Sequence, residues 1–272
     1  MPPDPPVVTF LSDYGLEDEW VGVVHGVIAR LCPGARVLDI THGVPRHDVR
    51  RGALLLRSAL PFVPPGVHLA VVDPEVGGTR RAVALRAGDG RLLVGPDNGL
   101  LTLAASDAGG VVEAVDVGHS PWRLEPVSAT FHGRDVFAPV AARLAAGEPV
   151  AAAGSPLDPD ELARLELPRP RREDGALVAH VLTLDRFGNA ALDATHEDAA
   201  AWGVPAGARV RVERSGSAPA TARMARTFAD AGPGELVLYE DAARLLALAV
   251  NRGSAAEHLG LRPDDELRLV PA

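Results

Sequence analysis

Short apolar runs alternate with longer amphipathic runs along the first half of the chain. The apolar runs at 7–11, 36–40 and 67–72 are rich in β-branched residues and bounded by turn residues, as buried strands are. Between them, residues 17–31 and 48–60 carry apolar positions at helical spacing behind acidic or capping residues. This alternation of strand, helix and strand predicts an α/β layer with a mostly parallel sheet.

Further elements of the same kind follow. Residues 82–87 and 91–95 are two strand-like runs that flank a Gly-Asp-Gly turn, so they predict a hairpin. Residues 134–146 have the apolar spacing of a helix. We assign both to the α/β domain.

Proline and charged residues interrupt the pattern over 147–175, where we predict a linker or crossover between two domains. Beyond it the chain consists of short strand-like runs separated by Gly, Pro and Asp turns, at 176–185, 208–214, 235–239 and 244–251. This pattern of short strands and turns predicts a smaller all-β domain, either barrel-like or sandwich-like. The predicted domains are an N-terminal α/β domain over 1–165 and a C-terminal β domain over 166–272.

Charge and cysteine content exclude several classes of protein. A formal net charge of -9, with acidic residues scattered along the chain, argues against a protein that binds nucleic-acid backbones. The single cysteine, Cys32, excludes an internal disulfide framework and a Cys-rich zinc site. The start MPPDPPVV resembles no signal peptide, and no run reaches the roughly 18 apolar residues of a membrane span. We therefore expect a cytoplasmic protein.

Acidic and amide side chains follow several of the predicted strands. Ligands of an open α/β sheet bind beyond the carboxyl ends of its strands, so these side chains are candidates for function. Asp13 follows the first strand, where a helix cap or a turn is an alternative role. Asp73 follows the third strand and precedes a proline, which leaves its side chain few local partners and favours function; Arg80 comes shortly after it. We interpret Asp97 and Asn98, before a glycine, as a turn with a helix cap.

Motifs of other enzyme classes are missing, and histidines give little sign of a metal site. The sequence contains no G-x-S-x-G elbow, no G-x-G-x-x-G and no P-loop. A metal site formed by Asp13, Asp73 and His132 is conceivable, but no short-spaced pair of ligands supports it. The other histidines of the first half lack ligand-like spacing relative to one another: His25, His42, His47 and His68. We interpret His42 as a hydrogen-bonded interior or loop histidine and expect no metal.

Seven motifs occur in the order and approximate spacing of one known family. They are SDYGLEDEWVG, LDITHGVPRHDV, VVDPEVGGTRR, VGPDNGLLT, SATFHGRDVFAPVAA, DRFGN and AVNRGSAA. Through them nearly the whole chain resembles the S-adenosylmethionine (SAM) hydroxide adenosyltransferase family, relatives of the SAM-dependent fluorinase and chlorinase. The resemblance implies an α/β domain, a barrel-like C-terminal domain, no cofactor, and a homotrimer that binds SAM between neighbouring subunits.

The resemblance also implies a reaction, the hydrolysis of SAM to adenosine and L-methionine by water or hydroxide that attacks the ribose C5′. Because methionine leaves from a sulfonium as a good neutral leaving group, aligning the water matters more than acid catalysis. Carried over from the family, Asp73 orients and polarises the water, His132 accepts or relays its proton, and Arg80 fixes the carboxylate. A carboxylate at Asp73 would repel a halide, which disfavours halogenation.

Substrate-binding residues follow from the same resemblance. Asp13 matches the carboxylate that holds the ribose diol, while Asp18 and Asp185 match positions near the methionine ammonium. Asn189 matches the amide that contacts adenine. Phe228 matches the ring that packs on adenine, although its sequence context alone is equally compatible with the core of a barrel.

Two positions depart from the family pattern at the methionine end. Ala242 stands where the resemblance implies a serine, and Trp20 stands where the halogenating relatives have a small hydroxyl residue. These departures keep open a non-catalytic protein that binds SAM or adenosine. A halogenase and a metal-dependent hydrolase are the remaining alternatives.

Overall fold

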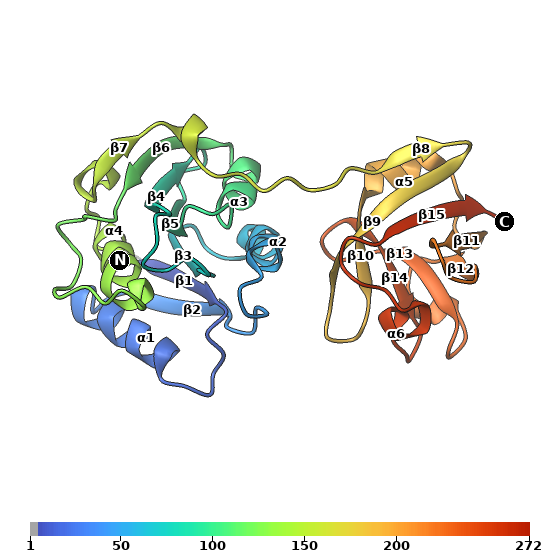
Figure 1. The fold of residues 1–272 in the computed structure, drawn as a ribbon, viewed down its shortest axis with the longest axis horizontal. Coiled ribbons are helices and arrows are strands. Elements are labelled where there is room, and N and C mark those ends of the chain that lie inside the picture. The colour runs from blue at the N-terminus through green and yellow to red at the C-terminus, as the bar shows by residue number, and fades with distance from the viewer. Residues whose placement is uncertain (1–4) are drawn as a thin grey trace. The chain divides into compact units, whose positions relative to one another are not determined.

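A computed structural model describes residues 5–272 of the chain. By their contacts these residues form two compact units, the first ending at Leu165 and the second spanning Glu166–Ala272 (Figure 1). Each unit has a hydrophobic core of its own. Within the described part of the chain, no helix combines the length and the apolar character that crossing a membrane requires.

A seven-stranded sheet forms the centre of the first unit, in the order β2-β1-β3-β5-β4-β6-β7. Its strands are β1 (Val7–Ser12), β2 (Arg36–Thr41), β3 (Val67–Val71), β4 (Ala82–Ala87), β5 (Leu92–Pro96), β6 (Val111–Asp116) and β7 (Ser155–Leu157). Strands β2, β1, β3 and β5 are parallel, whereas β4, β6 and β7 extend the sheet with antiparallel pairings. The predicted α/β domain is confirmed, and so is the predicted hairpin, which is β4 with β5.

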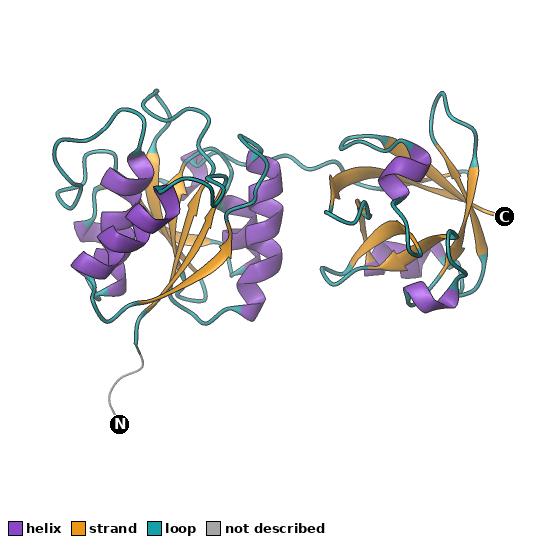
Figure 2. Ribbon diagram, turned by 90° about the horizontal axis from the view of Figure 1, so that it is seen from below, coloured by secondary structure: helices purple, strands orange, loops and turns teal. Residues whose placement is uncertain are grey.

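Helices cover both faces of this sheet, as Figure 2 shows. The helices are α1 (Trp20–Leu31), α2 (Val49–Ala59), α3 (Thr102–Asp107) and α4 (Ala138–Ala145). Successive strand residues point to opposite faces, so Phe10 packs in the core with α1 and α4, and Leu11 packs in the core with α2 and α3. The predicted helix over 134–146 begins with a π-helical turn, Gly133–Phe137, before it continues as α4.

The proline-rich stretch after α4 is partly folded onto the first unit. A 3₁₀ turn (Val150–Ala152) leads into β7, which pairs with β6 and forms the edge of the sheet. A second 3₁₀ turn (Pro159–Glu161) follows, where the guanidinium of Arg81 pairs with the Glu161 carboxylate. Regular structure is absent over residues 163–170.

The second unit is a closed barrel, so the barrel-like alternative is the correct one. Its strand order is β10-β14-β13-β12-β11-β15-β9, and the ring closes because β9 also pairs with β10. The seven strands are β9 (Ala176–Leu184), β10 (Ala190–Thr195), β11 (Arg209–Glu213), β12 (Ala220–Met224), β13 (Leu236–Glu240), β14 (Leu245–Val250) and β15 (Glu266–Pro271). A short strand β8 (Arg171–Glu173) pairs with β9, and helices α5 (His196–Trp202) and α6 (Ala255–Leu259) complete the unit.

Candidate active site

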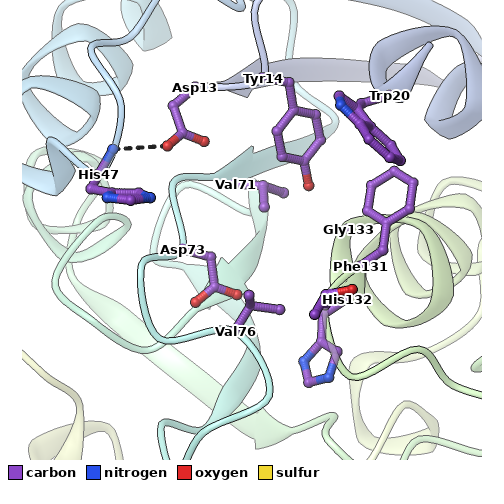
Figure 3. Close-up of a pocket in the computed structure, with 11 residues that line it drawn as sticks. Asp13, Tyr14, Trp20, His47, Val71, Asp73, Val76, Phe131, His132 and Gly133 are labelled. Carbon is purple, nitrogen blue, oxygen red and sulfur yellow. Dashed lines mark hydrogen bonds between the residues drawn. The ribbon is translucent and has the colours of Figure 1, made fainter. Parts of the chain in front are cut away.

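A cavity of about 250 Å³ opens at the carboxyl ends of β1 and β3 in the first unit. Figure 3 shows Asp13 and Tyr14 on one side of it, and Asp73 and His132 on the other. The lining residues are Asp13, Tyr14, Trp20, His47, Val71, Asp73, Val76, Thr130, Phe131, His132 and Gly133. The structure thus brings together the two strand-end carboxylates, Asp13 and Asp73, with the distant His132, at the sheet edge where α/β proteins bind ligands.

Asp73 and Arg80 form a buried ion pair beside the cavity. Arg80 Nε donates to Asp73 Oδ1 at 2.9 Å, and Arg80 Nη2 donates to Asp73 Oδ2. The two side chains are only 5% and 6% exposed, and the Arg80 guanidinium also lies over the ring of Phe137. Because the pairing is bidentate and shielded from water, it fixes the direction in which the carboxylate presents its remaining lone pairs.

His132 receives a hydrogen bond from the same arginine. Arg80 Nη2 lies 2.8 Å from His132 Nδ1, and since a guanidinium can only donate, Nδ1 must be the acceptor. A neutral His132 therefore carries its proton on Nε2. Burial lowers the pKa of His132 below its ordinary value, and the positive charge of Arg80 lowers it further. At neutral pH the imidazole is uncharged, and its Nε2–H is a donor.

A metal ion does not fit among Asp13, Asp73 and His132. Both carboxylate oxygens of Asp73 and the Nδ1 of His132 already bind the Arg80 guanidinium. The guanidinium thus already supplies the positive charge that a metal ion would bring. A metal ion beside it would be repelled by that charge. The donor set of this cavity argues against a metal-dependent hydrolase.

Asp13 holds the loop that follows β2. Its Oδ2 accepts the backbone N–H of His47 at 2.9 Å. The helix-cap alternative is wrong, because α1 begins at Trp20 behind Glu19. Asp13 instead lines the cavity together with His47, whose position there was not predicted.

Tyr14 is the main residue of the cavity that the sequence did not indicate. Its burial raises the pKa of the phenol, and the nearby charges of Asp13 and Asp73 act in the same direction. The hydroxyl therefore stays protonated and can donate a hydrogen bond into the cavity. The one signal in the sequence is its place directly after Asp13.

Gly133 leaves room for the Tyr14 hydroxyl. A Cβ atom built on Gly133 would lie 2.0 Å from Tyr14 Oη and 3.2 Å from its Cζ. We expect Gly133→Ala to lower the free energy of unfolding by about 1–3 kcal/mol, the usual cost of overpacking. Chemical denaturation measures this change. Tyr14→Phe removes the clashing atom, so Gly133→Ala should cost less free energy of unfolding in a Tyr14→Phe background. An equal cost of Gly133→Ala in both backgrounds would contradict this explanation.

An aromatic wall closes one side of the cavity. The rings of Trp20 and Phe131 meet edge to face with centroids 5.0 Å apart, and the rings of Tyr14 and Phe131 do so at 5.9 Å. Trp20 is 39% exposed, so much of the indole remains available to a ligand. The departure at position 20 thus lies in the cavity lining.

Some expected site residues lie elsewhere. Asp18 is exposed and does not line the cavity. Asp97 and Asn98 have structural contacts, as interpreted from the sequence, although neither caps a helix. Asp97 pairs with Arg81, while Asn98 Nδ2 donates to the backbone carbonyl of Val72 at 2.9 Å.

The other three expected residues belong to the second unit. Asp185 Oδ1 accepts the backbone N–H of Phe187 and of Asn189, and Asp185 Oδ2 accepts the Asn189 side-chain amide at 2.8 Å. Phe228 lies in a short 3₁₀ turn, is 41% exposed and contacts the ring of Tyr239. The alternative that Phe228 belongs to the barrel core is therefore wrong.

Known proteins share both units with this chain. The SAM hydroxide adenosyltransferase N-terminal domain matches residues 8–154, and the C-terminal domain of the same family matches residues 179–268. An (R)-S-adenosyl-L-methionine hydrolase from Salinispora tropica is 52% identical over 97% of this chain and 98% of its own. A fluorinase from Nocardia brasiliensis is 32% identical over 94% of each chain.

Solved structures agree with these matches. The crystal structure of an uncharacterized conserved protein from Thermotoga maritima is similar with a TM-score of 0.90 and 35% identity, over 97% of this chain and 99% of that one. Sequence and fold thus agree over both units. The chain belongs to the SAM hydroxide adenosyltransferase family.

Proposed function

We propose that the protein hydrolyses SAM to adenosine and L-methionine by attack of water on the ribose C5′. The observation that carries this proposal is the hydrogen bonding of Arg80 to both Asp73 and His132 at the cavity. Its support is the full-length similarity to a relative named as an (R)-S-adenosyl-L-methionine hydrolase. The reaction needs no cofactor, because the sulfonium substrate carries its own leaving group.

The proposed roles divide between a carboxylate and a donor. Asp73, held by Arg80, accepts a hydrogen bond from the water and withdraws its proton as the C–O bond forms. His132 donates from Nε2–H to the water oxygen, since its Nδ1 is occupied by Arg80. The family resemblance implies that His132 accepts or relays the proton; the arginine hydrogen bond favours positioning instead. Holding water in line with the C5′–sulfur bond can contribute roughly 7–11 kcal/mol in the best-oriented reactions.

The pH dependence follows from His132. Its pKa lies below the ordinary value of 6.5, and the neutral ring is the form that accepts from Arg80 and donates to water. We expect kcat/KM to be constant through neutral pH and to fall only below pH 6.5, when the ring gains its second proton. A pH–rate profile measures this decrease. A half-maximal kcat/KM at a pH above 6.5 would contradict the assignment of a neutral His132.

We propose that the sulfonium epimer is a determinant of the substrate. The relative's name specifies the (R) configuration at sulfur. Inverting sulfur exchanges the directions of its methyl group and its methionine chain relative to C5′. We therefore expect the rings of Trp20 and Phe131 to contact the two epimers differently. The hydrolysis of (R)-SAM is therefore the activity to measure first.

Substrate contacts are proposed for both units. Asp13 binds the ribose diol, Asp18 and Asp185 attract the methionine ammonium, and Asn189 and Phe228 bind the adenine. Support comes from the exposed ring of Phe228, which contacts the half-buried Tyr239, and from Asp13 in the cavity lining. Asn189 already donates one amide hydrogen to Asp185, so its second hydrogen and its oxygen are the groups proposed for adenine.

We further propose a cytoplasmic homotrimer in which neighbouring subunits complete each site. The cavity of about 250 Å³ is smaller than the roughly 300–1,000 Å³ of complete small-molecule sites, and the residues proposed for adenine are not in its lining. Sedimentation measures the subunit number. A monomer that turns over SAM at full rate would remove this proposal.

The deciding experiment is incubation of the protein with each SAM epimer, with and without chloride, followed by chromatography. Adenosine and methionine without added metal, and unchanged by a chelator, would support the proposed hydrolase. A halogenated nucleoside would identify a halogenase instead. Stoichiometric binding with no product after prolonged incubation would identify a binding protein, the alternative that Ala242 at the expected serine position motivates.

A further inference from the structure

Two histidines and an aspartate meet at the edge of the sheet, between α1 and β2. Asp39 lies on β2, His42 follows the end of this strand, and His25 lies on α1. The register between β1 and β2 shifts here, since Phe10 pairs with Asp39 but Leu11 pairs with Thr41. This bulge inserts one residue and redirects the end of β2, a feature that is common beside functional sites.

The three side chains converge through their ligating atoms. His25 Nε2 lies 2.8 Å from Asp39 Oδ1, and His42 Nε2 lies 3.1 Å from the same oxygen. One ligating atom from each residue lies within 4.8 Å of the others. The His42 side chain is 3% exposed, whereas His25 and Asp39 are 34% and 40% exposed, so the cluster is anchored on its inner side and open to solvent on its outer side.

The inner histidine is held with its Nε2 directed at the cluster. Ser12 is fully buried, and its Oγ is hydrogen-bonded to His42 Nδ1 at 2.8 Å. His42 Nε2 is buried without a hydrogen bond: its 3.1 Å contact with Asp39 has the distance of one but not the direction. A buried nitrogen whose contact with a carboxylate is poorly directed is not fully satisfied, so it remains available to a ligand at this cluster.

We propose that His25, Asp39 and His42 bind a divalent transition-metal ion such as Zn²⁺. Two imidazole nitrogens and one carboxylate oxygen, with an open side for water, are the donor set of many three-ligand zinc sites. Ligands of a tetrahedral zinc ion at about 2.0–2.1 Å lie roughly 3.3 Å apart. The 2.8 and 3.1 Å contacts with Asp39 would widen by a few tenths of an ångström around such an ion, and the third pair of ligating atoms also lies within 4.8 Å.

The ion would stabilise the loop that follows β2, next to the cavity, and would take no part in the proposed hydrolysis. The three residues do not line the cavity. However, the His42 carbonyl accepts the backbone N–H of Gly15 at 2.8 Å, and the next residues lead to His47, which binds Asp13. A cation that joins α1 to the end of β2 would stabilise this loop. The proposal therefore stands or falls independently of the enzymatic function.

The test is the binding of Zn²⁺ alone to the untagged full-length protein, measured by titration calorimetry after treatment with a chelator. We expect one equivalent of Zn²⁺ and a rise in Tm, because an ion that binds only the folded state stabilises it. Asp39→Asn and His25→Gln should each weaken binding by at least about tenfold, given that even residues that merely orient ligands change metal affinity by roughly 10–100-fold. His258→Gln, in the second unit, is the matched control and should bind like the parent.

Co²⁺ as a second probe reports the ligands directly. A visible absorption band typical of four-coordinate Co²⁺ should appear with the parent protein and be lost in both cluster variants. His25 lies on a partly exposed helix position, so His25→Gln should fold even if Asp39→Asn does not. The proposal would be overturned if the parent protein did not bind Zn²⁺. It would also be overturned if the parent, His25→Gln and His258→Gln bound Zn²⁺ equally, and the cluster would then be a hydrogen-bonded His–Asp–His group.

Discussion

Asp73→Asn is expected to lower the rate of SAM hydrolysis by about 10²–10⁴-fold, the usual contribution of a positioned proton acceptor. Asparagine keeps the size of the side chain and an oxygen for Arg80, but it can no longer withdraw a proton from water. Initial rates of adenosine formation at saturating SAM measure the loss. SAM affinity should be retained, because the proposed role concerns the water and not the nucleoside.

A matched control is available on the surface of the same unit. Asp107 pairs with Arg57 through two hydrogen bonds, as Asp73 does with Arg80, but its side chain is 51% exposed. Asp107→Asn should leave the rate unchanged. A fully active Asp73→Asn protein would remove Asp73 from the mechanism, whatever the control shows.

Arg80→Met is expected to lower the free energy of unfolding by about 3–5 kcal/mol, because it leaves the Asp73 carboxylate buried without its partner. Urea unfolding followed by tryptophan fluorescence measures the change, since Trp20 and Trp122 both lie in the first unit. The exposed pair again supplies the comparison. Arg57→Met should cost only about 0–1 kcal/mol, the range of surface ion pairs.

The double variant Asp73→Asn/Arg80→Met separates a stranded charge from lost packing. If the loss in Arg80→Met comes from the unpaired carboxylate, neutralising Asp73 should recover part of the stability. A double variant as unstable as the sum of the two single variants would show that packing of the Arg80 side chain over Phe137 dominates. The same buried pair means that Asp73→Ala confounds activity with folding, so asparagine is the informative substitution.

The fold was predictable where local pattern and burial agree. Strands β1, β2 and β3 are short apolar runs with clear boundaries, and the structure places them within one residue of the prediction. Strands β10, β12 and β15 were not predicted. Strand β10 contains the buried Asp193, which binds the backbone and ring of His180, and β12 contains two alanines and no β-branched residue except Thr221. Their strand conformation depends on barrel neighbours, not on their own propensity.

The sequence predicted the residues of the candidate site better than it predicted their hydrogen bonds and protonation states. Asp73 follows a strand and precedes a proline, so its position alone indicates function, whereas His132 was paired with it through the family resemblance. Arg80 and His132 are 52 positions apart in the sequence, so no rule based on residue spacing could predict the hydrogen bond between them or its direction. For the same reason the meeting of His25 with Asp39 and His42 could not be foreseen, because the bulge in β2 sets it.

Closure of the barrel has a consequence for how the chain acquires its structure during synthesis. Strand β15, near the carboxyl end, pairs with both β9 and β11. On the ribosome the first unit can fold once residue 165 has emerged, but β9 and β11 keep unpaired edges until β15 follows. Exposed edges of this kind invite pairing with other chains. We therefore expect the nascent protein to be most prone to pairing with other chains between the synthesis of β11 and that of β15.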